Sequence, residues 1–482
     1  MVKEKHNIKH NPNLNITLIH PFTIVPPFGI MSIASVLEKN GFNVKIVAYN
    51  KEKIPVKQIL TDIKDANLIG ISTYTMPMLK EAVRITRIIK KYSNALLVWG
   101  GVHATLFPHK SLQEFNLECV AINEGDFTML DIAKAVRDNK SFDKVKGIYV
   151  WKNKKVHFTG VREPIFDMKL LPKYAWHLID PRKYISINLI TRRKSILLVE
   201  SRGCPYNCSF CYVNNMFGRK WRGRSPKEVV EEMDFLNRKF KISHFDFLDD
   251  LPFGGSKSEM ITFCNLIKNK NYTWTCDYRV NCADFEVLKA MKQCGCKYIY
   301  YGVESGSPKI LKLLRKATTP KMIIRAFDLT NKVGINSMAG FICGFPDETI
   351  ADLKLTYKLA KRIKATKTRL AKYVPYPGGD LYQLAVQRGF KIPSKTIDFA
   401  YMGDYKAGNL NLSSIPDRVF EKYKKKIEYM TIPNSIKFAF KHNEFIFLPY
   451  FILDTLPASI SQKLITLIKV FTWPIKFLLK KK

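Results

Sequence analysis

Short apolar runs alternate with helical patterns along most of this 482-residue chain. In the first series, strands are expected at 15–20, 44–48, 68–72, 95–99 and 119–122, with helices at 29–40, 56–64 and 78–92. Strands that alternate with helices form a doubly wound parallel sheet, whose ligand crevice lies at the carboxyl ends of the strands. The N-terminal third is therefore expected to be a Rossmann-like α/β domain.

A second series predicts a different α/β architecture. Strands are expected at 196–201, 245–248, 273–278, 298–303, 337–343 and 369–374, and the helices between them at 226–239, 258–268, 284–294, 320–333 and 348–363. Six strands with intervening helices predict a partial (β/α)6 barrel of the TIM type. Its catalytic groups should stand at the carboxyl ends of the strands.

Three cysteines, Cys204, Cys208 and Cys211, come directly after the first strand of this second series. Thiolates at this spacing can converge on one [4Fe-4S] cubane and leave its fourth iron without a protein ligand. Chelation of the amino and carboxylate groups of S-adenosylmethionine (SAM) requires such an open iron. A structural zinc site would need a fourth Cys or His at matched spacing, which the flanking sequence does not offer. An unliganded cysteine-rich loop is the other alternative.

The loops after the strands of the first series carry small and polar residues. Glycines let the backbone approach a ligand closely, and hydroxyl groups can bond to amides or phosphate. The absence of a Gly-x-Gly-x-x-Gly sequence argues against a dinucleotide. The candidate ligand-binding residues here are Pro27, Ser72, Thr73, Gly100, Gly101, His103, Glu124 and Gly125.

Charged and turn-forming residues likewise end the strands of the second series. A carboxylate there can bind the ammonium or ribose hydroxyls of SAM, and a guanidinium can pair with its carboxylate. Strand-end acids and arginines also cap helices or form structural ion pairs, and Glu348 is expected to be a first-turn helix acid. The candidates are Asp249, Asp250, Arg279, Glu304, Ser305, Gly344 and Pro346.

Motifs in both series resemble one known family. Pro26–Glu38, Gly100–Thr105 and Glu124-Gly125 resemble the cobalamin (B12)-binding domain that precedes some radical SAM domains. Arg202–Tyr212 resembles the radical SAM cysteine motif, with Phe210 in its aromatic position. The strand-end motifs Asp-Asp, Arg-x-Asn, Gly-Val-Glu-Ser-Gly and Gly-Phe-Pro-Asp-Glu-Thr match as well. The chain is thus similar to class B radical SAM methyltransferases and to anaerobic magnesium-protoporphyrin monomethyl ester cyclases.

The resemblance implies three cofactors: a [4Fe-4S] cluster on the three cysteines, SAM at Phe210 and the strand ends of the second series, and cobalamin at the loops of the first. It implies reductive cleavage of SAM to a 5′-deoxyadenosyl radical, which abstracts hydrogen from an unactivated carbon. Methylation through cobalamin, cyclisation or rearrangement would follow. The Asp-x-His-x-x-Gly motif of many cobalamin domains is missing, which leaves the lower cobalt ligand open. His103 is either a contact of the nucleotide tail or a local hydrogen-bonding residue.

These patterns divide the chain into a B12-binding domain at 13–140, a connecting segment at 141–189, a radical SAM core at 190–405 and a mainly helical, basic C-terminal module at 406–482. In that module, the apolar run at 445–453 precedes an amphipathic pattern that ends near Trp473. Such a segment suits either an interfacial membrane helix or a helix packed on its own core.

The chain carries 79 Lys and Arg against 41 Asp and Glu, a net charge of +38. This charge would suit nucleic acid or anionic lipid, but a solvated Lys-rich surface explains most of it. The basic loop 218–224 would either meet an anionic substrate or serve as a structural loop beside the cysteines. Ten cysteines are too few for a disulfide scaffold, so a cytoplasmic location is expected, with peripheral membrane contact left open.

Two other functions would each account for part of the sequence. A radical SAM enzyme that modifies RNA without cobalamin, such as a methylthiotransferase, would need three N-terminal cluster cysteines, and residues 1–150 contain only Cys119. A non-enzymatic cobalamin sensor would leave the cysteine motif without a role. The expected partners are a small-molecule substrate and a one-electron reductant such as flavodoxin or ferredoxin. The hydrophobic C-terminus and the resemblance favour an apolar substrate such as an isoprenoid lipid, hopanoid or tetrapyrrole ester, and a peptide or antibiotic precursor is the alternative. Nucleic acid is disfavoured.

Overall fold

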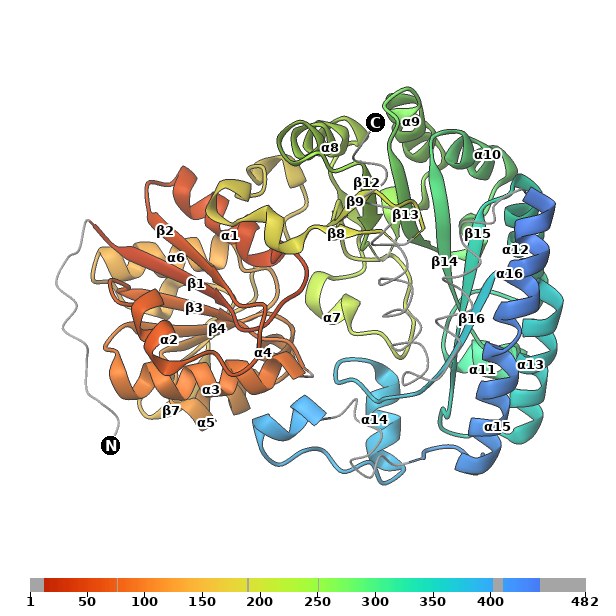
Figure 1. Cartoon of the computed structure of the whole chain (residues 1–482). Helices are drawn as coiled ribbons and strands as arrows, with labels where there is room; N and C mark the ends of the chain where they lie inside the picture. The colour runs from red at the N-terminus through yellow and green to blue at the C-terminus, as the bar shows by residue number, and fades with distance from the viewer. Residues whose placement is uncertain (1–12, 76, 189, 250, 402–410, 443–482) are drawn as a thin grey trace. The chain divides into compact units, whose positions relative to one another are not determined.

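The computed structural model describes residues 13–442 except 76, 189, 250 and 402–410. Contacts divide the chain into two compact units (Figure 1). Among the described residues, the first unit contains 13–185, 201–224 and 374–401, and the second contains 186–200, 225–373 and 411–442. The predicted boundaries at 140, 190 and 405 remain predictions.

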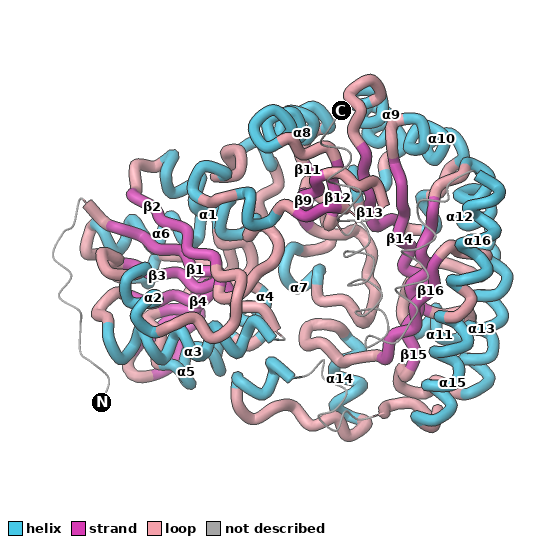
Figure 2. Tube along the Cα trace, in the orientation of Figure 1, coloured by secondary structure: helices cyan, strands magenta, loops and turns pink. Residues whose placement is uncertain are grey.

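The first unit is built on a seven-stranded sheet of order β2-β1-β3-β4-β5-β6-β7. Strands β1 to β4 of this sheet are labelled in Figure 2, where strands are magenta. The first five strands in this order are parallel, as predicted, and β6 and β7 add an antiparallel hairpin that was not predicted. The strands are β1 (Asn15–His20), β2 (Asn43–Ala48), β3 (Leu68–Ser72), β4 (Leu96–Gly100), β5 (Cys119–Ala121), β6 (Ile148–Lys152) and β7 (Lys155–Phe158).

Successive strand residues point to opposite faces of this sheet, and both faces are covered. Leu18 packs in a core with α1 (Phe28–Lys39) and α6 (Asp126–Arg137). Ile19 packs in the opposite core with α2 (Val56–Asp62), α3 (Pro77–Tyr92) and α5 (Pro108–Phe115). This doubly wound arrangement confirms the predicted fold of the unit.

The second unit holds a seven-stranded sheet of order β16-β15-β14-β13-β12-β9-β8. Six strands are parallel, and only the edge strand β8 is antiparallel to its neighbour. The predicted partial barrel is confirmed. Its strands are β8 (Ser186–Ile187), β9 (Lys194–Leu198), β12 (His244–Phe247), β13 (Thr273–Tyr278), β14 (Cys296–Glu304), β15 (Asn336–Cys343) and β16 (Lys367–Lys372).

Side-chain caps fix where the barrel helices begin. Ser225 and Glu228 form a capping box at α8, and Thr349 and Asp352 form another at α13. The helices are α8 (Pro226–Phe240), α9 (Lys257–Ile267), α10 (Phe285–Gln293), α11 (Pro308–Leu313), α12 (Pro320–Val333), α13 (Ile350–Ile363), α15 (Asp417–Glu428) and α16 (Thr431–His442). The apolar and amphipathic stretch after 442 lies outside the described residues. Within 13–442, no helix has the length and apolarity needed to span a membrane.

Candidate active site

The three cysteines lie in a loop that a short antiparallel ribbon closes at its base. Strands β10 (Ser201–Arg202) and β11 (Arg222–Gly223) pair on either side of the loop. Gly203 has φ +82°, and a Cβ there would stand 2.5 Å from the carbonyl oxygen of Lys220. Only glycine permits this approach, so the turn that leads into the cysteines depends on it.

Two of the cysteines border a hollow of about 250 Å³. Cys208 is buried, and Cys204 and Cys211 are partly exposed. Within the described residues, no three His, Cys, Asp or Glu side chains are arranged to hold a metal ion. Each thiolate of a cubane bonds a different iron, so three cluster ligands need not meet at one point. Three thiols on one loop, two of them at the hollow, therefore fit a cluster. The hollow is lined by Asn207, Cys208, Ser209, Cys211, Asn214, Asn215, Gly218, Arg219, Gly378, Gly379 and Asp380.

A second segment packs directly on the cysteine loop. Leu381, in α14 (Asp380–Gln387), donates its backbone N–H to the carbonyl oxygen of Ser209 at 2.9 Å. A Cβ on Gly379 would stand 2.6 Å from that same carbonyl oxygen and 3.0 Å from the carbonyl carbon of the half-buried Phe210. This close approach requires glycine at 379.

Two arginines join the ribbon to acidic residues of the doubly wound fold in the first unit. Arg202 donates to Glu124 at 2.9 Å and to Asp126 at 2.6 Å, while Arg222 donates to Glu124 at 2.6 Å. The side chain of Arg222 is only 1% exposed. Of the two interpretations of the basic loop, the structural one therefore holds at Arg222. Glu124, a candidate cobalamin contact, uses both carboxylate oxygens in these ion pairs, and its place in cofactor binding stays a prediction.

The turn after β4 depends on a second glycine. Gly101 has φ +92°, and a Cβ there would lie 2.7 Å from the carbonyl oxygen of Thr73 and 3.3 Å from the hydroxyl of Ser72. The Thr73 hydroxyl donates to the carbonyl of Gly100 at 2.8 Å and accepts from the N–H of Ala104 at 3.2 Å. The Thr73 hydroxyl therefore stabilises this turn. Its predicted contact with a ligand stays a prediction.

The same edge of the sheet has room for a ligand. A Cβ on Gly29, just after Pro27 at the start of α1, would meet no atom within 4 Å, and one on Gly100 would meet nothing closer than 3.9 Å. Gly125 differs, because a Cβ there would lie 2.8 Å from Ile33. Open backbone at Gly29, at the start of α1, fits the approach of a large flat cofactor such as cobalamin, whereas a Cβ on Gly100 would be in ordinary contact with Ala121.

His103 was expected in a loop, and that placement is wrong. It lies in α4 (Val102–Leu106), is 0% exposed and packs against the rings of Phe107 and Phe399, at 5.3 and 5.4 Å. Burial lowers its pKa to about 3, so the ring is neutral. Nδ1 lies 3.3 Å from the hydroxyl of Thr75, which favours the local hydrogen-bonding interpretation. A contact with the cofactor stays a prediction.

In the second unit, two candidate residues join one buried polar cluster. Glu304 ends β14 with φ +64°, a strained conformation of the kind that collects at functional sites. Its carboxylate accepts from the ammonium of Lys316 at 2.6 Å, and the guanidinium of Arg279 donates to the carbonyl of Lys316. Lys316 was missed because it belongs to no motif and to no strand end.

Other candidates make contacts that shape the barrel itself. Asp249 accepts the N–H of Glu200 at 3.0 and 3.1 Å, which joins the end of β12 to the end of β9. The hydroxyl of Ser305 lies 3.1 Å from that of Thr356 on α13. Asp250 lies outside the described residues. Contacts of these residues with SAM remain predictions.

Glu348 was expected in the first turn of a helix, but α13 begins only at Ile350. Its carboxylate instead accepts the N–H groups of Gly344, at 2.6 Å, and Phe345, at 3.1 Å, and so closes the turn that holds the buried Pro346. Burial raises the pKa of Glu348 to about 7, because the two backbone hydrogen bonds only partly offset the loss of solvation.

This pKa predicts a pH-dependent stability. A carboxyl group whose pKa is higher in the folded state binds more protons folded than unfolded, so stability falls as the pH rises from about 4.5 to about 7. The full cost above that window is about 3 kcal/mol. Glu348→Gln stays neutral, so its unfolding free energy in urea should match wild type at pH 4, below the window, and exceed it at pH 8. Equal differences at both pH values would contradict the assignment.

Comparison with protein families decides what this chain is. A model of the Radical SAM superfamily matches residues 199–360, and a model of the B12 binding domain matches residues 15–133. An uncharacterised methyltransferase of Pyrococcus horikoshii is 32% identical over 370 residues, which cover 76% of this chain and 79% of the relative. The chain belongs to the radical SAM superfamily.

Further comparisons place this radical SAM chain among those with B12-binding domains. The anaerobic magnesium-protoporphyrin IX monomethyl ester cyclase of Rubrivivax gelatinosus is 29% identical over 74% of this chain and 66% of its own length. The structure of TsrM, a radical SAM methyltransferase from Kitasatospora setae with cobalamin and a [4Fe-4S] cluster bound, matches with a TM-score of 0.68. That match covers 88% of both chains at 16% identity, which shows the shared fold.

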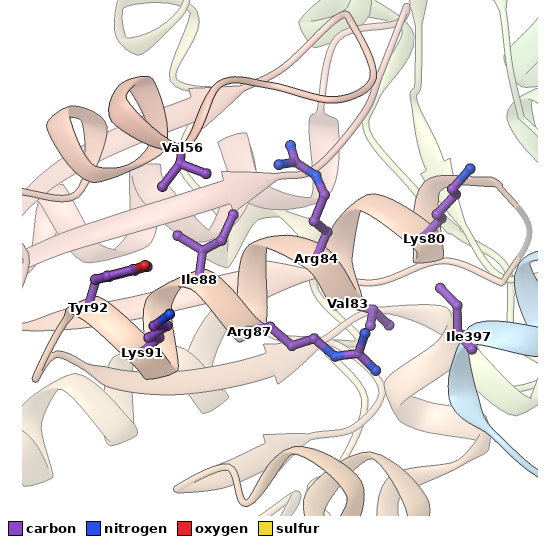
Figure 3. A pocket seen from close by; sticks show the side chains of 9 residues that line it. All are labelled: Val56, Lys80, Val83, Arg84, Arg87, Ile88, Lys91, Tyr92 and Ile397. Atoms are coloured by element: carbon purple, nitrogen blue, oxygen red, sulfur yellow. The ribbon is translucent and has the colours of Figure 1, made fainter.

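The two family matches and the shared fold together confirm the predicted cofactor set of [4Fe-4S] cluster, SAM and cobalamin. The B12-binding match favours the predicted enzyme over a cobalamin-free RNA-modifying enzyme, and the Radical SAM match favours it over a sensor. A larger hollow, of about 490 Å³, lies elsewhere in the first unit along α3 (Figure 3). It contains no predicted site residue, and its lining combines Lys80, Arg84, Arg87 and Lys91 with apolar side chains. The predicted ligand residues Cys208 and Cys211 border the smaller hollow instead.

Proposed function

We propose that this chain is a cobalamin-dependent radical SAM methyltransferase that acts on an unactivated carbon of a small molecule. The observation that carries the proposal is the joint match of one chain to both domain families. The methyltransferase relative, at 32% identity over 79% of its length, supports methyl transfer.

Each proposed site has its own residues. Cys204, Cys208 and Cys211 would hold the cluster through their thiolates, with Phe210 beside the adenine of SAM. Arg279, Glu304 and the other strand ends of the barrel would bind the remainder of SAM, and the loops at Pro27, Ser72 and Gly100–His103 would bind cobalamin. When bound, these cofactors supply reductive SAM cleavage and a carrier for the methyl group.

The net reaction balances with two molecules of SAM. One is reduced and cleaved to methionine and a 5′-deoxyadenosyl group, which takes the substrate's hydrogen atom and leaves as 5′-deoxyadenosine. The other gives up its methyl group, which forms the new carbon–carbon bond, and leaves as S-adenosylhomocysteine. This balance consumes two electrons, which a one-electron carrier such as flavodoxin or ferredoxin would supply in two separate transfers.

Cyclisation is the second candidate, and similarity to the Rubrivivax cyclase favours it. That enzyme's name also supports an apolar substrate of the tetrapyrrole ester type. Peripheral membrane contact rests on the sequence beyond residue 442 alone. A cytoplasmic location is proposed on the cysteine content.

Methyl-deuterated SAM separates these reactions. Reconstituted anaerobic protein is supplied with dithionite and, in turn, with no substrate or with magnesium-protoporphyrin monomethyl ester. The proposal predicts both 5′-deoxyadenosine and S-adenosylhomocysteine in every arm, and a deuterated methyl group on any product. An unlabelled ring-closed product would instead establish the cyclase. Formation of 5′-deoxyadenosine without S-adenosylhomocysteine would contradict methyl transfer.

A further inference from the structure

A buried ion cluster joins the cysteine loop to the B12-binding fold. Arg202 Nη1 donates to Glu124 Oε1 and Asp126 Oδ2, and its Nη2 donates to Asp126 Oδ1 at 3.1 Å and to the hydroxyl of Ser32 at 2.9 Å. Arg222 Nη1 donates to Glu124 Oε2. We call Arg202, Arg222, Glu124, Asp126 and Ser32 the arginine clamp.

The clamp is buried and electrically balanced. Its four charged side chains are between 1% and 10% exposed, and two guanidinium groups face two carboxylates. Burial alone would raise the pKa of Asp126, but the charge and hydrogen bonds of Arg202 lower it below its usual value. Removal of one partner from a buried pair leaves an uncompensated charge, so the clamp constrains geometry far more than a surface ion pair does.

The clamp lies at the base of the cysteine loop. Arg202 is on β10, two residues before Cys204, and Arg222 is on the paired strand β11. Its partners belong to the B12-binding fold, since Glu124 and Asp126 flank the start of α6 and Ser32 is on α1. Arg222 also donates to the carbonyl of Ile165 at 2.8 Å. Residues 201–224 accordingly group by contacts with the first unit and not with the barrel.

We propose that Glu124 and Asp126 are positioning residues, which hold the cysteine loop as a part of the B12-binding fold and thereby set where the cluster stands relative to the corrinoid. This inference rests on the proposed function, which assigns the cluster to the cysteines and cobalamin to the N-terminal fold. On this inference, Glu124 holds the cysteine loop in place and does not contact cobalamin directly.

The test compares Glu124→Gln with Asp131→Asn in reconstituted holoenzyme. Asp131 also lies on α6 and pairs with Arg162, but its side chain is 40% exposed. Glu124→Gln should keep its iron and corrinoid, and 5′-deoxyadenosine formation without substrate should stay within about threefold of wild type. S-adenosylhomocysteine formation should fall by about 100-fold, because small misplacements of reacting groups cost that much. Asp131→Asn should match wild type in all four quantities.

Electron paramagnetic resonance provides a readout apart from turnover. With the cluster reduced and cob(II)alamin loaded, the magnetic interaction between the two paramagnets depends on their separation. Glu124→Gln should change this interaction, whereas Asp131→Asn should not. If Glu124→Gln fails to fold, Glu124→Gln/Arg222→Gln carries the test, because the remaining Arg202 and Asp126 still balance in charge.

Three results would overturn the inference: loss of corrinoid with iron intact, a spectrum and product ratio equal to wild type, or equal loss of both products. Loss of corrinoid would make Glu124 a cofactor contact. Failure of the proposed function would look different from failure of this inference. In that case the wild-type protein itself would bind no cluster or no corrinoid.

Discussion

Cys208→Ala is expected to abolish SAM cleavage. Loss of one thiolate leaves the cluster with two protein ligands, and its iron content should fall steeply. Formation of 5′-deoxyadenosine should drop by more than about 100-fold, because even outer-shell changes at metal sites cost about 10- to 100-fold. Iron and sulfide analysis together with quantification of 5′-deoxyadenosine checks this result.

Cys264→Ala is the matched control. Cys264 lies in α9 of the barrel, is 2% exposed and belongs to no ligand motif, so its loss should affect packing alone. This variant should keep its iron and its SAM cleavage. A Cys208→Ala protein that kept both would contradict the cluster assignment and revive the sensor hypothesis.

Gly101→Ala is expected to separate corrinoid binding from SAM cleavage. Its Cβ would lie 2.7 Å from the carbonyl oxygen and 3.0 Å from the amide nitrogen of Thr73, at φ +92°. Both atoms belong to the backbone, so the turn between β4 and α4 must shift, at a cost of about 3 kcal/mol. Corrinoid content should fall by about tenfold or more, because the displaced turn belongs to the predicted cobalamin edge. Iron content should stay at the wild-type level.

Gly41→Ala is the control for Gly101→Ala. It tests whether a steric clash or the positive φ alone causes the loss of corrinoid. Gly41 has φ +80°, but a Cβ there would meet no atom within 4 Å. It should lose about 1 kcal/mol of stability and no corrinoid. Corrinoid binding by Gly101→Ala at the wild-type level would contradict the placement of cobalamin at this edge.

The sequence predicted the two sheets because their strands obey local rules. The six parallel barrel strands are apolar runs between well-capped helices, and each was found within a few residues of its expected place. The cysteine motif was also recognisable, since its ligands lie within eight residues. Both sheets and the cysteine motif could thus be predicted from residues that lie close together in the sequence.

What escaped prediction depends on contacts between distant segments. Arg202 and Glu124 are 78 residues apart, and neither residue by itself indicates the other. Lys316 pairs with Glu304 from the far side of helix α11 (Pro308–Leu313), 12 residues further along the chain. His103 was assigned to a loop because Gly100-Gly101 predicts a turn, whereas helix α4 begins immediately after it. Such contacts form only when distant segments pack together. A single sequence does not show which distant residues will meet.

The iron, sulfide and corrinoid content of the full chain, purified anaerobically and supplied with hydroxocobalamin, tests both cofactor sites at once. A cobalamin-dependent radical SAM enzyme should contain about four irons, four sulfides and one corrinoid per chain. Four irons without corrinoid would keep the radical SAM chemistry but contradict the cobalamin-dependent mechanism, and a chain that binds no iron would contradict the central claim.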